Sequence, residues 1–338
     1  MKRLILIVVL SMVFLIGNHV ESVWADEPYG HLSSNPVTKR VGEEGFVFGN
    51  GILDVDFGLQ GGYISGYTKY HISFDGGASE LEFPLEAYLF GFNLGWGFRN
   101  EQKQEKVRME IKWLTNVSDG RGKMEDSDWI DDDADFLGIS GYHHSGKDIY
   151  SESDVKLRAH IFNANVMYNV WLIKNFSIGP MAGYRYQIFK YDVKNTNQIG
   201  YGEYAPDFSA SVRGNTLKYK IKYHIPYLGL SSNLSFGKVF KTNLSLCYAP
   251  WAFVKDRDVH LLRHKLSKTD SDGHAFIGNL NTTLHLLAHL YLSAGADYLW
   301  IHTTGTQDQY FYDVLYYEVD NKVTSLQWVV YGTMTYRF

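Results

Sequence analysis

Hydrophobic and polar residues alternate along most of the chain beyond residue 50. In 217–225, leucine, tyrosine and isoleucine side chains alternate with three lysines and a histidine, and 106–115 has the same period of two. Successive side chains of an extended strand point to opposite faces, so the pattern predicts strands with one apolar and one polar face. Aromatic residues are frequent on the apolar face, which is typical of strands that lie between lipid and a polar lumen. A soluble β-sandwich with an aromatic core is the alternative.

Ten segments carry the pattern, and long polar connections alternate with short ones between them. The predicted strands are 52–74, 78–98, 104–117, 152–173, 176–195, 213–236, 240–259, 272–287, 289–304 and 322–338. The longer connections are 118–151, 196–212, 260–271 and 305–321. Outer-membrane barrels have short periplasmic turns and larger outer loops. We therefore predict an all-β fold, a ten-stranded antiparallel transmembrane β-barrel with extended extracellular loops.

The first 25 residues predict a cleaved secretory signal peptide. Lys2 and Arg3 precede an uncharged apolar run over 4–16, and small or apolar residues lead up to a cleavage position after Ala25. The run is shorter than the roughly 18 residues that a membrane-spanning helix needs. We expect residues 26–338 to form one barrel domain.

The C-terminal segment predicts where the barrel resides. Trp328, Val330, Met334, Tyr336 and Phe338 fall on one face of the last predicted strand, and Phe338 is the final residue. A final amphipathic strand with a terminal aromatic residue resembles the signal by which bacterial outer-membrane barrels are recognised for assembly. We expect the bacterial outer membrane as the location.

Charge and cysteine content narrow the possible partners. The net charge of −5 gives no indication of nucleic acid as a partner. Cys247 is the only cysteine, which excludes an internal disulfide. No feature of the sequence requires a second copy, and we expect a monomer.

Two short clusters predict chemistry at the rim of the barrel. Asp126 and Asp128 are two residues apart, as are Asp258 and His260, so each pair points to one face of a strand. In a catalytic interpretation, His260 is the general base and Asp258 orients its imidazole. Asp126 and Asp128 would position the attacking water from the other side.

Solvated loop charges and a metal site are alternative interpretations of these residues. The acidic stretch 126–135 has a calcium-like composition, but it lacks the glycine and the terminal glutamate of an EF-hand loop. His143 and His144 are adjacent, so on a strand they would point to opposite faces. We predict no metal site.

Several motifs resemble those of the omptin family of outer-membrane proteases, over nearly all of 26–338. Residues 62–69 (GYISGYTK) resemble the first-strand pattern G-x-L-S-G-x-T-K. Residues 122–131 (GKMEDSDWID) resemble G-N-M-x-D-x-D-W-M-D, and the Asp256-x-Asp258-x-His260 cluster follows Trp251 at the family's spacing. The resemblance implies a barrel that protrudes from the outer membrane.

The resemblance also implies an endopeptidase whose active site faces the exterior. Its catalytic residues would be Asp126, Asp128, Asp258 and His260, and its substrates peptides or proteins at the cell surface. No cofactor is expected, although the family is activated by lipopolysaccharide. Lys222 falls where one basic residue of the lipopolysaccharide-binding cluster is expected, whereas Ile188 occupies the place of another.

The substrate pocket departs from the family pattern at one position. Members that cleave between basic residues carry a glutamate after the first-strand T-K, and this chain has Tyr70 there. Asp256 matches the other acidic residue of the pocket. One carboxylate attracts a basic side chain less than two do, so we expect cleavage at or near basic residues without a strict dibasic requirement.

A non-catalytic outer-membrane barrel, an adhesin or a small pore, is the alternative function. Ten strands enclose a narrow lumen. We expect Arg108, Glu110, Lys112, Lys218 and Lys220 to point inward and to fill this lumen with paired charges.

Overall fold

The computed structural model describes residues 37–38, 46–48, 51–74, 76–130, 147–173, 175–201, 208–237 and 239–338. The predicted signal peptide, most of the acidic stretch after Ile130 and the pair His143-His144 lie outside these residues. The chain divides into two compact units, Met1–Thr38 and Lys39–Phe338, and the first contributes only β1 (Val37–Thr38) to the described part. Within that described part, no helix is long and apolar enough to cross a membrane.

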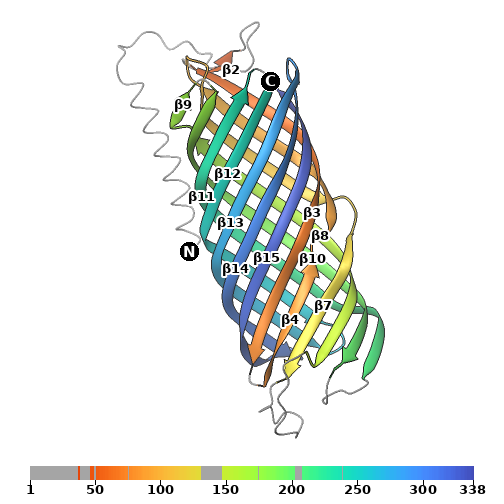
Figure 1. Ribbon diagram of the computed structural model, residues 1–338. Coiled ribbons are helices and arrows are strands. Elements are labelled where there is room, and N and C mark those ends of the chain that lie inside the picture. The colour runs from red at the N-terminus through yellow and green to blue at the C-terminus, as the bar shows by residue number, and fades with distance from the viewer. Residues whose placement is uncertain are drawn as a thin grey trace. The chain divides into compact units, whose positions relative to one another are not determined.

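The larger unit is a closed ring of antiparallel strands (Figure 1). The strands are β2 (Phe46–Phe48), β3 (Gly51–Phe74), β4 (Gly77–Pro84), β5 (Ala87–Arg99), β6 (Glu105–Asn116), β7 (Gly120–Ile130), β8 (Ile149–Tyr168), β9 (Trp171–Ile173), β10 (Phe176–Gly200), β11 (Ser209–Phe236), β12 (Phe240–His260), β13 (Lys265–Leu287), β14 (Leu290–Phe311) and β15 (Val314–Arg337). Their order is β4-β7-β8-β6-β5-β3-β15-β14-β13-β12-β11-β10-β9, and the pairings β4–β3 and β8–β10 close the ring.

Thirteen strands lie on this path, where we predicted ten, because the predicted strands 78–98 and 152–173 are each divided in two and β7 lies in a segment that we had assigned to a loop. β4 and β5 pair with successive parts of β3, and β6 and β7 pair with successive parts of β8. The first interruption follows Pro84, which has no N–H to donate to a sheet. The second, at 169–170, separates β8 from β9, and β7 follows β6 after 117–119, within the predicted loop 118–151.

Two of the extended loops that we predicted are strand instead. The segment 260–271 narrows to a turn between β12 and β13 at 261–264, and 305–321 narrows to a turn at Tyr312 and Asp313 between β14 and β15. Both Tyr312 and Asp313 have positive φ, 47° and 65°, which is the geometry of a type I′ hairpin turn. The strands therefore continue as long hairpins at the end of the ring that carries β4 and β7 (Figure 1).

Along β11 the polarity of the two faces reverses. In its C-terminal half, Leu228 and Leu230 are exposed on the outside and Ser231 is buried in the lumen. In its N-terminal half, Tyr219 and Ile221 are buried inside, and the lysines alternate with them on the outside. The expectation that Lys218 and Lys220 face the lumen was wrong, whereas Arg108, Glu110 and Lys112 do form ion pairs of the lumen.

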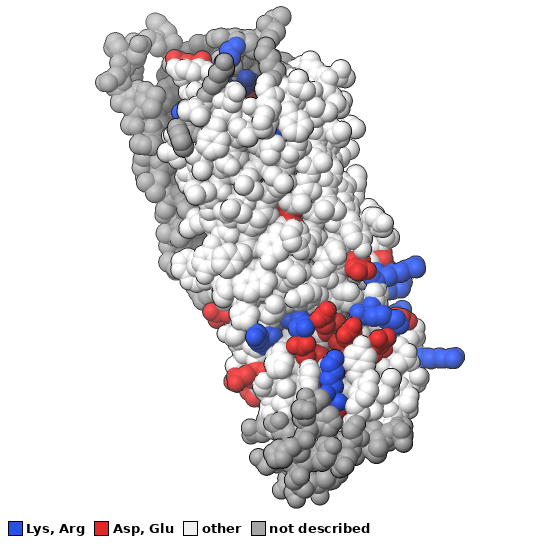
Figure 2. Space-filling model, in the orientation of Figure 1, with Lys and Arg blue, Asp and Glu red and all other residues white. Residues whose placement is uncertain are grey.

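The reversal separates a lipid-facing band from a solvated extension. Figure 2 shows a middle band almost free of charged side chains and a cluster of acidic and basic side chains toward the end that carries β4 and β7. Outward ion pairs in this extension join Lys123 to Asp154 and Lys156 to Asp119. Charged residues are destabilising on a lipid face, so the extension lies outside the membrane.

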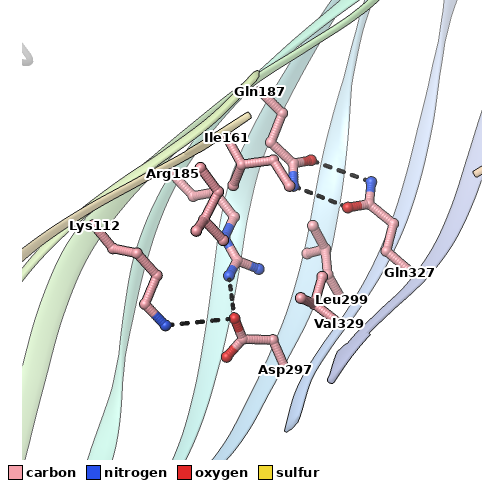
Figure 3. A pocket seen from close by; sticks show the side chains of 9 residues that line it. Lys112, Ile161, Arg185, Gln187, Asp297, Leu299, Gln327 and Val329 are labelled. Carbon is pink, nitrogen blue, oxygen red and sulfur yellow. Dashed lines mark hydrogen bonds and ion pairs between the residues drawn. The ribbon is translucent and has the colours of Figure 1, made fainter. Parts of the chain in front are cut away.

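Side chains fill the lumen of the membrane part. The carboxylate of Asp297 lies 3.3 Å from Nη2 of Arg185 and 3.8 Å from Nζ of Lys112 (Figure 3). One layer nearer the extension, the side-chain amides of Gln187 and Gln327 bond to each other across the lumen, at 2.9 and 3.1 Å. These contacts leave only a small cavity among them and argue against a water-filled pore.

Candidate active site

The site lies inside the solvated extension, on strands from opposite parts of the sequence. β7 carries Asp126 and Asp128, and it pairs with β4, where Leu81 faces Asp126 and Ser79 faces Asp128. β12 carries the other cluster, Asp256, Asp258 and His260. Each cluster alternates with outward residues, so the period of two directs its side chains into the barrel.

The histidine and its aspartate are in direct contact. Nε2 of His260 lies 3.0 Å from Oδ2 of Asp258, which is fully buried. Nδ1 of His260 lies 3.0 Å from Nη2 of Arg263, in the turn after β12. An arginine can only donate, so Nδ1 is the acceptor and the neutral ring carries its proton on Nε2, which donates to Asp258.

Electrostatics keep Asp258 ionised. Burial would raise the pKa of Asp258, but the His260 side chain and the hydrogen bond from Tyr70 hold it below its ordinary value. The carboxylate can therefore stabilise a positive charge on the imidazole.

The facing aspartates behave differently. Desolvation and then the charge of Asp128 raise the pKa of Asp126 to about 8, and desolvation raises that of Asp128 as well. The hydroxyl of Ser79 donates to Oδ1 of Asp126 at 3.4 Å. The charge of Asp128 thus disfavours ionisation of Asp126, and Asp126 is mostly protonated at neutral pH.

The structure brings the two clusters together. The charge of Asp258 acts on Asp126, and that of His260 acts on Asp128. The guanidinium of Arg263 contacts His260 and its charge also favours ionisation of both β7 aspartates, so it acts on both clusters.

Four aromatic rings form the floor of the site. Tyr70, Phe83, Tyr191 and Tyr219 are each at most 2% exposed. The ring centroid of Phe83 lies 4.3 Å from that of Tyr219 and 4.9 Å from that of Tyr191, and Tyr70 lies 5.5 Å from Tyr219. This aromatic floor separates the site from the polar lumen below.

Two phenols of the floor each hold one aspartate of β12. The hydroxyl of Tyr70 donates to Oδ2 of Asp258 at 2.6 Å, and that of Tyr219 donates to Oδ2 of Asp256 at 3.3 Å. Burial raises the pKa of Asp256 to about 7, so this carboxyl is partly neutral near pH 7.

Lys222 lies apart from the site, on the outside of the barrel. It pairs with Ile188 in β10 and with Lys255 in β12. Its neighbour Lys220 is also outward, and the charges of Lys222, Lys190 and Arg257 act on it. The result is a basic patch on the solvated extension.

Four residues that contact the site or act on it electrostatically were not identified from the sequence. They are Ser79, Tyr219, Arg263 and Lys265, of which Lys265 acts electrostatically on the aspartates of both clusters. Only Arg263 and Lys265 gave a signal, as basic residues within five positions of His260. Ser79 and Tyr219 meet the site through strand register and ring closure, which no local motif encodes.

Fold and surface together define an outer-membrane β-barrel with an aspartate–histidine cleft in its solvated extension. The family model for the omptin family matches residues 91–309, more than half of the chain. The chain belongs to the omptin family. Membership makes it a protease of the bacterial outer membrane, whose substrates are peptides or proteins at the cell surface.

Distant likenesses to solved structures are also found. No curated protein sequence matches significantly. Among solved structures, the outer membrane protein OprG from Pseudomonas aeruginosa is similar at 13% identity, over 84% of this chain and 95% of that one, with a TM-score of 0.37. The toluene transporter TbuX from Ralstonia pickettii is similar at 11% identity, over 90% and 92%, with a TM-score of 0.33. No conclusion about function rests on these two.

Proposed function

We propose that this chain is an endopeptidase in which His260 activates water for direct attack on the peptide bond. The contact between Nε2 of His260 and Asp258, beside the protonated carboxyl of Asp126, carries the proposal. Because Nε2 is engaged, the water proton goes to Nδ1, and Asp258 stabilises the resulting imidazolium. The protonated carboxyl of the Asp126–Asp128 pair donates to the oxyanion that develops on the carbonyl.

Arg263 must leave Nδ1 before this step can occur. Its side chain is exposed and comes from a turn, so a substrate entering the cleft can displace it. When Arg263 moves away, its positive charge no longer acts on the aspartates, and a basic side chain of the substrate would take its place. Asp256, which accepts a hydrogen bond from Tyr219, would form the inner end of the pocket for that side chain, and cleavage at or near basic residues is proposed on this ground. Tyr70, at the position of the family's glutamate, is bonded to Asp258 instead.

The solvated extension would face the cell exterior, where substrates are found. The basic patch around Lys222 carries the charge that lipopolysaccharide phosphates require, and we propose lipopolysaccharide as an activator that binds there. No metal or other cofactor is part of the mechanism, and the protein is proposed to act as a monomer. A chelator should leave activity unchanged, whereas loss that calcium restores would show a metal site.

The test uses residues 26–338 refolded in detergent with lipopolysaccharide and quenched peptides that contain Arg or Lys. General-base catalysis contributes about 10²–10⁴ in rate, so His260→Ala should lower kcat by roughly that factor. Asp126→Asn should also collapse activity, and both variants should keep the folded barrel. Wild-type activity that persists in both variants would reject the site.

An adhesin or a pore is the second candidate. The filled lumen around Asp297 argues against the pore. An adhesin would not require the contact between His260 and Asp258, and it would bind a surface without hydrolysing the peptides.

A further inference from the structure

We propose that Tyr70 is a positioning residue for Asp258, a role that rests on the proposed function. The phenol of Tyr70 on β3 reaches across the barrel to the carboxylate on β12, 188 positions away, at 2.6 Å. Nε2 of His260 contacts the same oxygen, Oδ2. Tyr70 therefore acts on the reaction through Asp258 and does not itself touch the reacting atoms.

Two donors on one oxygen fix the orientation of the carboxylate. Asp258 is fully buried, so no solvent competes for Oδ2, and hydrogen bonds to an ionised group in such a place are strong. The phenol of Tyr70 is itself held in place, because its ring packs against Tyr219 and Phe83, at 5.5 and 6.3 Å. The carboxylate held in this way fixes the position of Nε2 of His260 in turn.

A phenol suits this position better than a further acid. Asp126, Asp256 and Asp258 all act electrostatically on Tyr70, so a carboxyl at position 70 would add a fourth acid to a buried cluster in which the pKa values of Asp126 and Asp256 are already raised. A phenol donates a hydrogen bond and stays neutral. Tyr70 is 2% exposed, which leaves little of its surface for a substrate side chain.

The Tyr70→Phe variant tests the role because it keeps the ring and removes only the donor. Asp258 would lose the orienting contact, and we expect kcat to fall about tenfold with KM unchanged. Without this donor the carboxylate would stabilise the imidazolium of His260 more strongly. The acid limb of the kcat/KM profile should therefore move to higher pH. A purely structural role would not move this limb.

Tyr191→Phe is the matched control. Tyr191 belongs to the same aromatic floor, lies 4.9 Å from Phe83, and its hydroxyl has no hydrogen-bond partner among the described residues. Removing this hydroxyl should leave kcat, KM and the pH profile unchanged. Equal losses in both variants would show that the floor merely loosens, which would overturn the proposal.

A measurement independent of turnover completes the test. In protein labelled with ¹⁵N-histidine, the Nε2–H resonance of His260, assigned with His260→Ala, should move downfield in Tyr70→Phe because Asp258 becomes a stronger acceptor. It should not move in Tyr191→Phe. An unmoved resonance, or a rise in KM alone, would overturn the positioning role. If the wild type is inactive but the resonance still moves downfield in Tyr70→Phe, the proposed function is rejected and the contact between Tyr70 and Asp258 stands.

Discussion

Replacing Asp126 by asparagine should make the barrel more stable at alkaline pH while it abolishes activity. The folded protein raises the pKa of Asp126 from 3.8 to about 8, so the folded state binds a proton that the unfolded state releases. Stability then falls as pH rises from about 4 to 8, because the native state holds more protons over this range. Asparagine has the same shape and no proton to lose.

The magnitude follows from the size of that pKa change. At about 1.36 kcal/mol for each pKa unit, a rise from 3.8 to about 8 corresponds to roughly 6 kcal/mol. Asp126 is half-buried, so water screens part of this and we expect roughly 3 kcal/mol. Burial of two like charges, rather than any loss of packing, would be the cause.

The assay is urea unfolding in detergent, followed by tryptophan fluorescence, at pH 4, 6, 8 and 9. The free energy of unfolding of Asp126→Asn should exceed that of the wild type by roughly 3 kcal/mol more at pH 9 than at pH 4. Parallel pH curves for the two proteins would refute the reasoning, because Asp126 would then titrate alike in both states.

Asp119→Asn is the control. Asp119 is exposed and lies 2.9 Å from Nζ of Lys156, whose hydrogen bond lowers its pKa. A lowered pKa contributes stability above the ordinary pKa that is lost as pH falls, the opposite direction to Asp126. An exposed ion pair contributes less than about 1 kcal/mol, so this variant should be slightly less stable at pH 9.

Three further predictions concern the sheet, the lumen and the turn above the site. Gly91→Ala should impair refolding, because its Cβ would lie 1.9 Å from the carbonyl oxygen of Trp113, whereas Gly61→Ala meets open space and should refold normally in a gel-shift assay. Planar bilayers that contain the wild type should show no steady conductance, and stable channels would contradict the filled lumen around Asp297. Arg263→Ala removes a positive charge that lowers the pKa of Asp126, so the basic limb of the kcat/KM profile should move to higher pH; a shift to lower pH would contradict this.

The alternation of the sequence predicted most of the strands, and it failed where the membrane ends. β7 (Gly120–Ile130) was missed because Arg121, Lys123 and Glu125 point to water while Asp126 and Asp128 point into the cleft. Both faces of this strand are polar at the site, so no contrast between apolar and polar faces marks it as a strand. The segments 265–271 and 305–309, which are strand in the structure, are also polar on both faces and were missed for the same reason.

Which face of a strand points into the barrel was predicted correctly only for the membrane-spanning part. Near Arg108 an apolar outer face and a charged lumen follow from the surroundings of the barrel. Near Tyr219 the surroundings are water on the outside and a packed interior, and the same period of two has the opposite orientation. A pattern fixes which residues share a face, but the solvent decides which face is inside.

The spacing of residues in the sequence predicted contacts within one strand. Contacts between distant strands depend on how the ring of strands closes, which the sequence pattern does not show. The two-residue step between Asp258 and His260 predicts their proximity, and their side chains are in contact. The bond from Tyr70 to Asp258 depends on where β3 and β12 stand around the barrel, and a change of register by one residue would reverse the direction of each side chain. The catalytic roles themselves remain predictions until the variants are measured.

Extending the strands beyond the membrane explains how this fold can hold four carboxyls in one cleft. In the lipid-facing part the lumen charges are paired, as Asp297 is with Lys112 and Arg185. In the extension, Asp126 and Asp128 oppose each other and oppose folding, so the stability must come from elsewhere. The aromatic floor and the continuous strand pairings on either side supply it without neutralising the charges. A site that is destabilised by its own chemistry can persist there, which is why Asp126→Asn should exchange activity for stability.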